Sequence, residues 1–132
     1  MADNAPNERA IRVFVLEDDP DLAEMLRRWF AGAGMEFSHC ADGEAAWELL
    51  QGAPPDVVLA DLMVPGISGQ EFVAKLRAHP ATSHTAVIVM SASILNAAQG
   101  AEMKDILQAD HVFSKPLLLR DVLAKVRELT AR

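Results

Sequence analysis

Short apolar runs alternate with amphipathic segments along almost the whole chain, and this alternation strongly restricts its possible folds. Five runs rich in β-branched and apolar residues have the length of buried strands; they are Ile11–Leu16, Met35–Cys40, Val57–Ala60, Ala86–Met90 and Val112–Phe113. Each run is followed by apolar residues at helical spacing. Strands that alternate with helices form a parallel sheet covered by helices on both faces, so the chain is predicted to be an α/β protein.

The predicted helices begin and end at turn residues. Asp19 is expected to cap the first helix, with Pro20 at its first position, and Gly32 is expected to end it. A second helix follows Asp42. The last three helices are predicted over Gln70–Ala78, Leu95–Leu107 and Leu118–Leu129. We expect one domain over residues 11–131, after a flexible tail of residues 1–10.

Tryptophans fall on the apolar faces of the first two predicted helices. Trp29 follows Leu22, Met25 and Leu26 at helical spacing, and Trp47 lies among the apolar residues of the second helix. We therefore expect both indoles to pack in the core rather than to form a ligand platform.

Charged and hydroxyl side chains follow four of the predicted strands. Glu17-Asp18-Asp19 comes after the first strand, Asp61 after the third, Ser91 after the fourth and Lys115-Pro116 after the fifth. In an open parallel sheet, ligands bind at the carboxyl ends of the strands, so these side chains are expected to converge at one edge. Carboxylates, a hydroxyl and an ammonium group at one edge indicate a magnesium-assisted phosphoryl-transfer site.

Asp61 is the predicted centre of this chemistry. A carboxylate can attack a phosphoryl group and form an aspartyl phosphate. Two unit charges 4 Å apart repel by about 4 kcal/mol at an effective dielectric of 20, so neighbouring acids need a cation. Mg²⁺ suits this role because it binds carboxylates and phosphoryl oxygens. Lys115 and Ser91 can then interact with further phosphoryl oxygens, and the Lys115–Pro116 peptide is a plausible cis bond.

Charge and composition exclude several other classes of protein. The net charge is −7 and no Lys/Arg cluster is visible, which argues against direct binding of nucleic acid. The apolar runs are too short to span a membrane, and residues 1–10 lack the pattern of a signal peptide, so we expect a cytoplasmic protein. The single cysteine, Cys40, fits a reducing compartment and is expected to pack in the fold.

The histidines show no spacing typical of a metal site. We interpret all four as surface or packing residues; they are His39, His79, His84 and His111.

The four motifs V-L-E-D-D-P, L-A-D-L-M-V-P-G-I-S-G, V-M-S-A and F-S-K-P occur in this order along the chain. With them, the chain from Ile11 to Ala131 resembles the receiver domain of bacterial two-component response regulators. The resemblance implies a flavodoxin-like (βα)5 fold, a three-layer sandwich with a parallel five-stranded sheet of order 2-1-3-4-5.

The resemblance also implies roles for individual residues. Asp61 would be the phosphoacceptor, and Ser91 and Lys115 would hold the phosphoryl group. The small residue Ala92 would leave room for that group. The Mg²⁺ ligands would be Asp61, Asp18 directly, Glu17 through water, and the backbone carbonyl of Met63. Asp19 remains the helix cap.

One position departs from the pattern of the family. Three residues before the lysine, the family usually has Tyr or Phe, which takes part in signal propagation, whereas this chain has Val112. Phe113 follows directly, but successive residues of a strand face opposite sides of the sheet. We therefore expect Phe113 to pack in the core and the usual mode of signal propagation to be altered.

The function predicted from the residues and the resemblance is that of a stand-alone receiver. It would take a phosphoryl group from a sensor histidine kinase or a histidine phosphotransferase and signal through altered contacts with another protein, as a monomer or weak dimer. It would not be an enzyme, apart from autocatalytic phosphoryl transfer and self-dephosphorylation. One alternative is a phosphorelay shuttle or phosphate sink. Another is an interaction module that works without phosphorylation and keeps a vestigial site.

Overall fold

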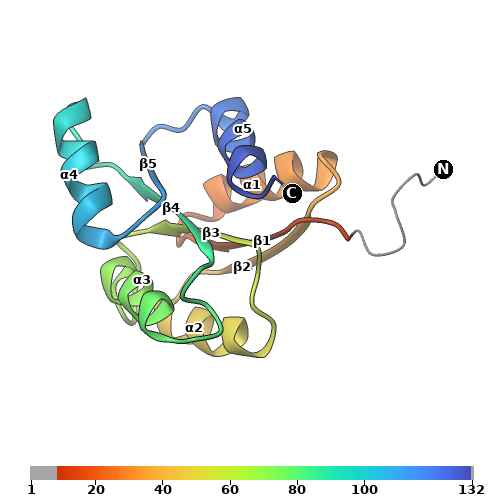
Figure 1. The fold of residues 1–132 in the computed structure, drawn as a ribbon. Helices are drawn as coiled ribbons and strands as arrows, with labels where there is room; N and C mark the ends of the chain where they lie inside the picture. Colours follow the sequence, from red (N-terminus) through yellow and green to blue (C-terminus); the bar gives the residue numbers. More distant parts are fainter. Residues whose placement is uncertain (1–8, 132) are drawn as a thin grey trace.

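The computed structural model describes residues 9–131, which form a parallel sheet between two layers of helices (Figure 1). The sheet has the order β2-β1-β3-β4-β5, which confirms the predicted topology. The strands are β1 (Arg12–Leu16), β2 (Glu36–Cys40), β3 (Val57–Asp61), β4 (Ala86–Ser91) and β5 (His111–Ser114). The helices are α1 (Pro20–Gly32), α2 (Gly43–Gly52), α3 (Gly69–Ala78), α4 (Ala97–Leu107) and α5 (Leu119–Leu129).

The alternation of side chains along the central strands divides the core into two clusters. On β1, Val13 and Val15 face α1 and α5, whereas Phe14 and Leu16 face α2 and α3. The three central strands are buried on both faces, as expected for strands covered by helices on each side. The edge strands β2 and β5 are more exposed than the central strands.

The helix boundaries follow from local capping. The side chain of Asp19 accepts hydrogen bonds from the backbone N–H groups of Asp21 and Leu22, which confirms it as the cap of α1. α4 begins at Ala97 rather than at Leu95, because the side chain of Asn96 accepts a hydrogen bond from the N–H of Gln99 and caps the helix there.

The prediction for Trp29 is wrong. The buried face of α1 consists of Ala23, Leu26 and Phe30, and Trp29 lies beside this face with 44% of its surface exposed. Trp47 is half-buried and packs against the core, with its ring edge-to-face against Phe72 at a centroid distance of 6.4 Å.

The predicted tail, residues 1–10, lies outside the described residues except for its last two. Arg9 donates hydrogen bonds to both carboxylate oxygens of Asp56, at 2.8 and 2.9 Å, just before β1. Within residues 9–131, no helix is long and apolar enough to cross a membrane.

Candidate functional site

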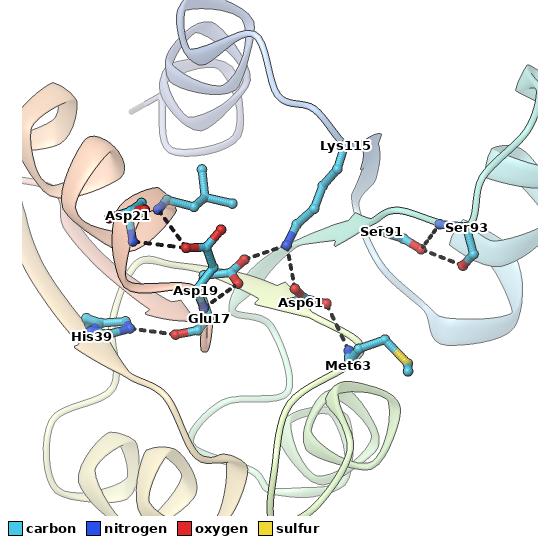
Figure 2. Close-up of polar contacts among 10 residues, drawn as sticks. Glu17, Asp19, Asp21, His39, Asp61, Met63, Ser91, Ser93 and Lys115 are labelled. Carbon is cyan, nitrogen blue, oxygen red and sulfur yellow. Dashed lines mark hydrogen bonds and ion pairs between the residues drawn. The ribbon is translucent and has the colours of Figure 1, made fainter.

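The carboxyl edge of the sheet brings together the side chains predicted from the sequence (Figure 2). Glu17 follows β1, Asp61 is the last residue of β3, Ser91 ends β4 and Lys115 follows β5. These strands are neighbours in the order β1-β3-β4-β5, and their parallel register aligns their carboxyl ends. The arrangement therefore follows directly from the topology.

Lys115 joins two buried carboxylates. Its Nζ donates a hydrogen bond to Oε1 of Glu17 at 2.8 Å and another to Oδ2 of Asp61 at 2.5 Å. Glu17 is fully buried and Asp61 is 6% exposed, so both acids depend on such partners rather than on bulk water. The peptide between Lys115 and Pro116 is cis, as predicted.

The pKa values of Glu17 and Lys115 are both raised, but by different causes. Burial raises the pKa of Glu17, against the opposing effect of its hydrogen bonds from Lys115 and from the N–H of Asp19, and the charge of Asp61 raises it further. Burial alone would lower the pKa of Lys115, but its hydrogen bonds to Asp61 and Glu17 outweigh this and raise it. Lys115 is therefore a cation at neutral pH.

Three carboxylates are close enough to bind one metal ion. Glu17, Asp18 and Asp61 can each offer one oxygen, and these oxygens lie within 4.8 Å of one another. Asp18 is exposed, whereas the other two are buried. Three negative charges against the single ammonium of Lys115 leave an excess of negative charge, and hard oxygen donors are the ligands that Mg²⁺ prefers. The residues present therefore fit a divalent cation.

The loop after β3 holds Asp61 through its backbone. The N–H of Met63 donates to Oδ1 of Asp61 at 2.8 Å, while the Met63 side chain is 81% exposed. Gly69, the first residue of α3, packs against the start of this loop so closely that a Cβ there would collide with the backbone oxygen of Asp61. Both oxygens of Asp61 thus have a fixed partner, Met63 for one and Lys115 for the other.

Ser91 lies at the end of β4 with its hydroxyl turned toward the following loop (Figure 2). Its Oγ is 2.9 Å from Oγ of Ser93 and accepts a hydrogen bond from the N–H of Ser93 at 3.2 Å. Ala92, between them, is exposed. In this conformation the hydroxyl of Ser91 is engaged with Ser93.

Val112 and Phe113 face opposite sides of the sheet. Val112 packs against the cluster under α2 and α3, and Phe113 packs against the cluster under α1 and α5, which confirms Phe113 as a packing residue. Val112 also lines a cavity of about 470 Å³ between the β4–α4 loop, α4 and β5. Leu95, which is 82% exposed, lies at the same cavity.

The sequence did not indicate His39 as part of the site. Its sequence context indicates a surface or packing residue, whereas in the structure its Nε2 lies 2.7 Å from the backbone oxygen of Glu17. The contact depends on the pairing of β1 with β2. His39 is opposite Val15 in this pairing, and Val15 is two residues before Glu17. Strand order alone, without side-chain geometry, does not reveal this contact.

Comparisons with known proteins agree with this geometry. A family model described as the response regulator receiver domain matches residues 13–127. The DNA-binding response regulator MtrA of Mycolicibacterium smegmatis is 33% identical over 118 residues, which cover 88% of this chain and 49% of MtrA. The chain spans about half the length of the curated relatives it matches.

Solved structures show the same fold. The receiver domain of Francisella response regulator 1452 matches with a TM-score of 0.82 at 25% identity, covering 91% of this chain and 96% of that one. The chemotaxis protein CheY4 of Vibrio cholerae matches with a TM-score of 0.82 at 21% identity, covering 92% of this chain and 99% of that one, which is a likeness of fold.

Proposed function

The chain belongs to the response regulator receiver domain family, and from this premise we propose that it is a signalling switch with Asp61 as its phosphoacceptor. The observation that carries the proposal is the contact of Lys115 with both Asp61 and Glu17 at the carboxyl edge of the sheet. Glu17 makes the same kinds of contact, with Lys115 and with the N–H of Asp19, but it is fully buried, whereas 6% of Asp61 is exposed.

The proposed reaction is a single displacement at phosphorus. A carboxylate oxygen of Asp61 forms a bond to the phosphorus atom, while the bond between phosphorus and the donor breaks. The leaving group is the imidazole of a phosphohistidine or, with a small donor, the acetate of acetyl phosphate. The ammonium of Lys115 neutralises charge on the phosphoryl oxygens, the hydroxyl of Ser91 donates a hydrogen bond to one of them, and Ala92 leaves room for the group. Such catalysis depends on positioning, which two fixed contacts to Asp61 provide.

A bound Mg²⁺ would supply charge neutralisation for the acidic cluster and the phosphoryl group. We propose Asp18 and Asp61 as direct ligands, Glu17 as a ligand through water, and the backbone carbonyl of Met63 as a further ligand. Glu17 suits an indirect role because it is fully buried, whereas Asp18 is exposed and 6% of Asp61 is exposed.

The output is proposed to begin at Ser91. A phosphoryl dianion at Asp61 would compete with Ser93 for the hydroxyl of Ser91, and the β4–α4 loop starts at that contact. A local change of charge that biases a mobile element is sufficient for a switch. The face formed by α4, β5 and α5 would carry the changed contacts to a downstream protein.

Several finer predictions belong to this proposal. The phosphoryl donor would be a sensor histidine kinase or a histidine phosphotransferase, and the chain would act as a switch rather than as an enzyme on an external substrate. A cytoplasmic location, a monomeric or weakly dimeric state and a domain of residues 11–131 also remain predictions.

Intact-mass spectrometry after incubation with acetyl phosphate tests the proposal. We expect the wild type to gain one phosphoryl group in the presence of Mg²⁺ and to gain none after chelation with EDTA. Asp61→Ala should gain none in either condition, because it removes the carboxylate proposed to accept the phosphoryl group and to contact Lys115. Asp105→Ala, which changes an exposed acid on α4, is the matched control and should be labelled like the wild type.

A negative result with the small donor leads to a second measurement. Beryllofluoride with Mg²⁺ mimics the phosphorylated carboxylate without the need for a donor. Failure of the wild type both to be labelled and to bind beryllofluoride would contradict the phosphoacceptor role and favour an interaction module with a vestigial site.

A further inference from the structure

His39 on β2 holds the peptide group that carries the acidic pair of the site. Its Nε2 is 2.7 Å from the carbonyl oxygen of Glu17 (Figure 2). A carbonyl oxygen can only accept, so the imidazole donates and its hydrogen is on Nε2. The neighbouring residue of the same strand acts on the same backbone unit, since the carbonyl oxygen of Cys40 accepts a hydrogen bond from the N–H of Glu17 at 3.1 Å. Two consecutive residues of β2 thus fix both backbone polar groups of Glu17.

The carbonyl that His39 holds belongs to the peptide linking Glu17 to Asp18. A peptide group is planar, so fixing its oxygen also fixes the position of the next Cα atom, that of Asp18. Asp18 is exposed, and its position depends on the backbone more than on packing of its side chain. The orientation of this single peptide therefore sets how the carboxylate of Asp18 approaches those of Glu17 and Asp61.

We propose that His39 is a positioning residue for the cation site, acting on Asp18 through the carbonyl of Glu17. The inference rests on the proposed function, because it concerns the affinity of the acidic cluster for Mg²⁺. Groups that orient metal ligands from the second layer typically change metal affinity by 10-fold to 100-fold when removed. His39 acts through one backbone hydrogen bond, so we expect an effect at the lower end of that range, about 10-fold.

Two substitutions separate the hydrogen bond from the ring. His39→Leu removes the donor, whereas His39→Gln keeps an N–H that can reach a backbone carbonyl. His84→Leu is the matched control. His84 is an exposed histidine in the loop between α3 and β4, and this loop lies at the amino ends of the strands, away from the site at their carboxyl ends. Since His39 is on an exposed edge strand, the fold should tolerate these changes, and urea unfolding checks this directly.

The measurement is a titration of each protein with MgCl₂, followed by the NMR shifts of the backbone amides of residues 17, 18 and 63. We expect His39→Leu to bind Mg²⁺ about 10-fold more weakly than the wild type, and His39→Gln and His84→Leu to bind within about 2-fold of it. The maximal rate of labelling by acetyl phosphate should return toward the wild-type value in His39→Leu at saturating Mg²⁺. A purely structural role for His39 would lower stability without this change in affinity.

Equal Mg²⁺ affinity in His39→Leu and the wild type would overturn the inference while leaving the proposed function intact. A loss of affinity in His39→Gln as large as in His39→Leu would also overturn it, because the donor would then not matter. Absence of Mg²⁺ binding in the wild type itself would instead contradict the cation site, and with it both proposals.

Discussion

Lys115 contacts Glu17 and Asp61, both of them buried acids, and is itself mostly covered, with 20% of its side chain exposed. Removing one partner of a buried ion pair leaves an uncompensated charge. The free energy lost in this way is larger than the net free energy that the intact pair contributes to stability. Before any phosphoryl group arrives, the ammonium therefore stabilises the fold as well as the site. The stability of the fold and the proposed phosphoryl transfer thus both depend on Lys115.

Lys115→Met tests this dual role. At pH 7 with EDTA, we expect the free energy of unfolding in urea to fall by about 2 kcal/mol, somewhat less than for a fully buried pair because water reaches part of the site. Lys104→Met on α4, which removes an exposed cation, should change stability by less than about 0.5 kcal/mol. Similar small losses in both variants would show that Glu17 and Asp61 do not need the ammonium.

Protonation of His111, which lies outside the acidic site, makes the free energy of unfolding depend on pH. Burial lowers its pKa from 6.5, and the nearby Lys125 and Lys104 lower it further. The pKa of His111 is lower in the folded state, so as the pH falls the unfolded chain binds the proton first. The contribution of neutral His111 to the free energy of unfolding is therefore fully present above about pH 6.5 and is lost as the pH falls below that value. We expect His111→Gln to lose less stability than the wild type between pH 7.5 and pH 5.5.

Urea unfolding at these two pH values measures the effect. His84→Gln, at an exposed histidine, serves as the control and should follow the wild type. An unchanged pH dependence in His111→Gln would contradict the assignment to His111.

At the scale of elements, the start of α3 packs closely against the end of β3. Gly69 allows the helix to begin directly against the end of β3, where a Cβ would lie 2.6 Å from the Cα of Leu62. Any side chain there must push α3 away from the strand that carries Asp61. The close approach thus links the packing of a helix to the position of the phosphoacceptor.

Gly69→Ala should lower the free energy of unfolding by about 2 kcal/mol, the usual cost of forcing extra atoms into a packed region. Gly32→Ala is the matched control, because Gly32 ends α1 with open space around it. Replacing a helical glycine by alanine without a clash should stabilise the protein by about 0.5 kcal/mol. Equal effects of the two substitutions, measured by urea unfolding, would contradict the close packing at α3.

The helices and strands could be predicted because each depends on a local pattern, whereas the strand order followed from the resemblance to receiver domains. Apolar runs predicted the buried strands, and capping residues such as Asp19 predicted where helices begin. Trp29 could not be predicted, since a helical repeat places it beside the buried face but does not show where that face ends. His39 could not be predicted either, because its contact with Glu17 joins two strands and depends on the direction of one side chain.

At the scale of the whole molecule, the acidic cluster couples cation binding to folding. Glu17 and Asp18 follow β1 and Asp61 ends β3, so their carboxylates converge only in the folded chain. A ligand that binds the folded state alone stabilises it by mass action. The cation would therefore reduce the cost of gathering these charges.

Mg²⁺ should accordingly raise the stability of the protein. Above the dissociation constant, each tenfold increase in Mg²⁺ concentration is expected to add about 1.4 kcal/mol to the free energy of unfolding. Asp18→Asn should show a much smaller gain, and chelation with EDTA should remove the gain from the wild type. A Mg²⁺ effect of equal size in Asp18→Asn would place the cation elsewhere.

The central claim is that Asp61 itself carries the phosphoryl group. The most direct measurement is reduction of the labelled protein with borohydride, which converts a phosphorylated aspartate to homoserine, followed by peptide sequencing by mass spectrometry. We expect homoserine at position 61, with unmodified aspartate at positions 18 and 19. Homoserine at another position, or its absence from protein that has gained a phosphoryl group, would contradict the role of Asp61 as phosphoacceptor.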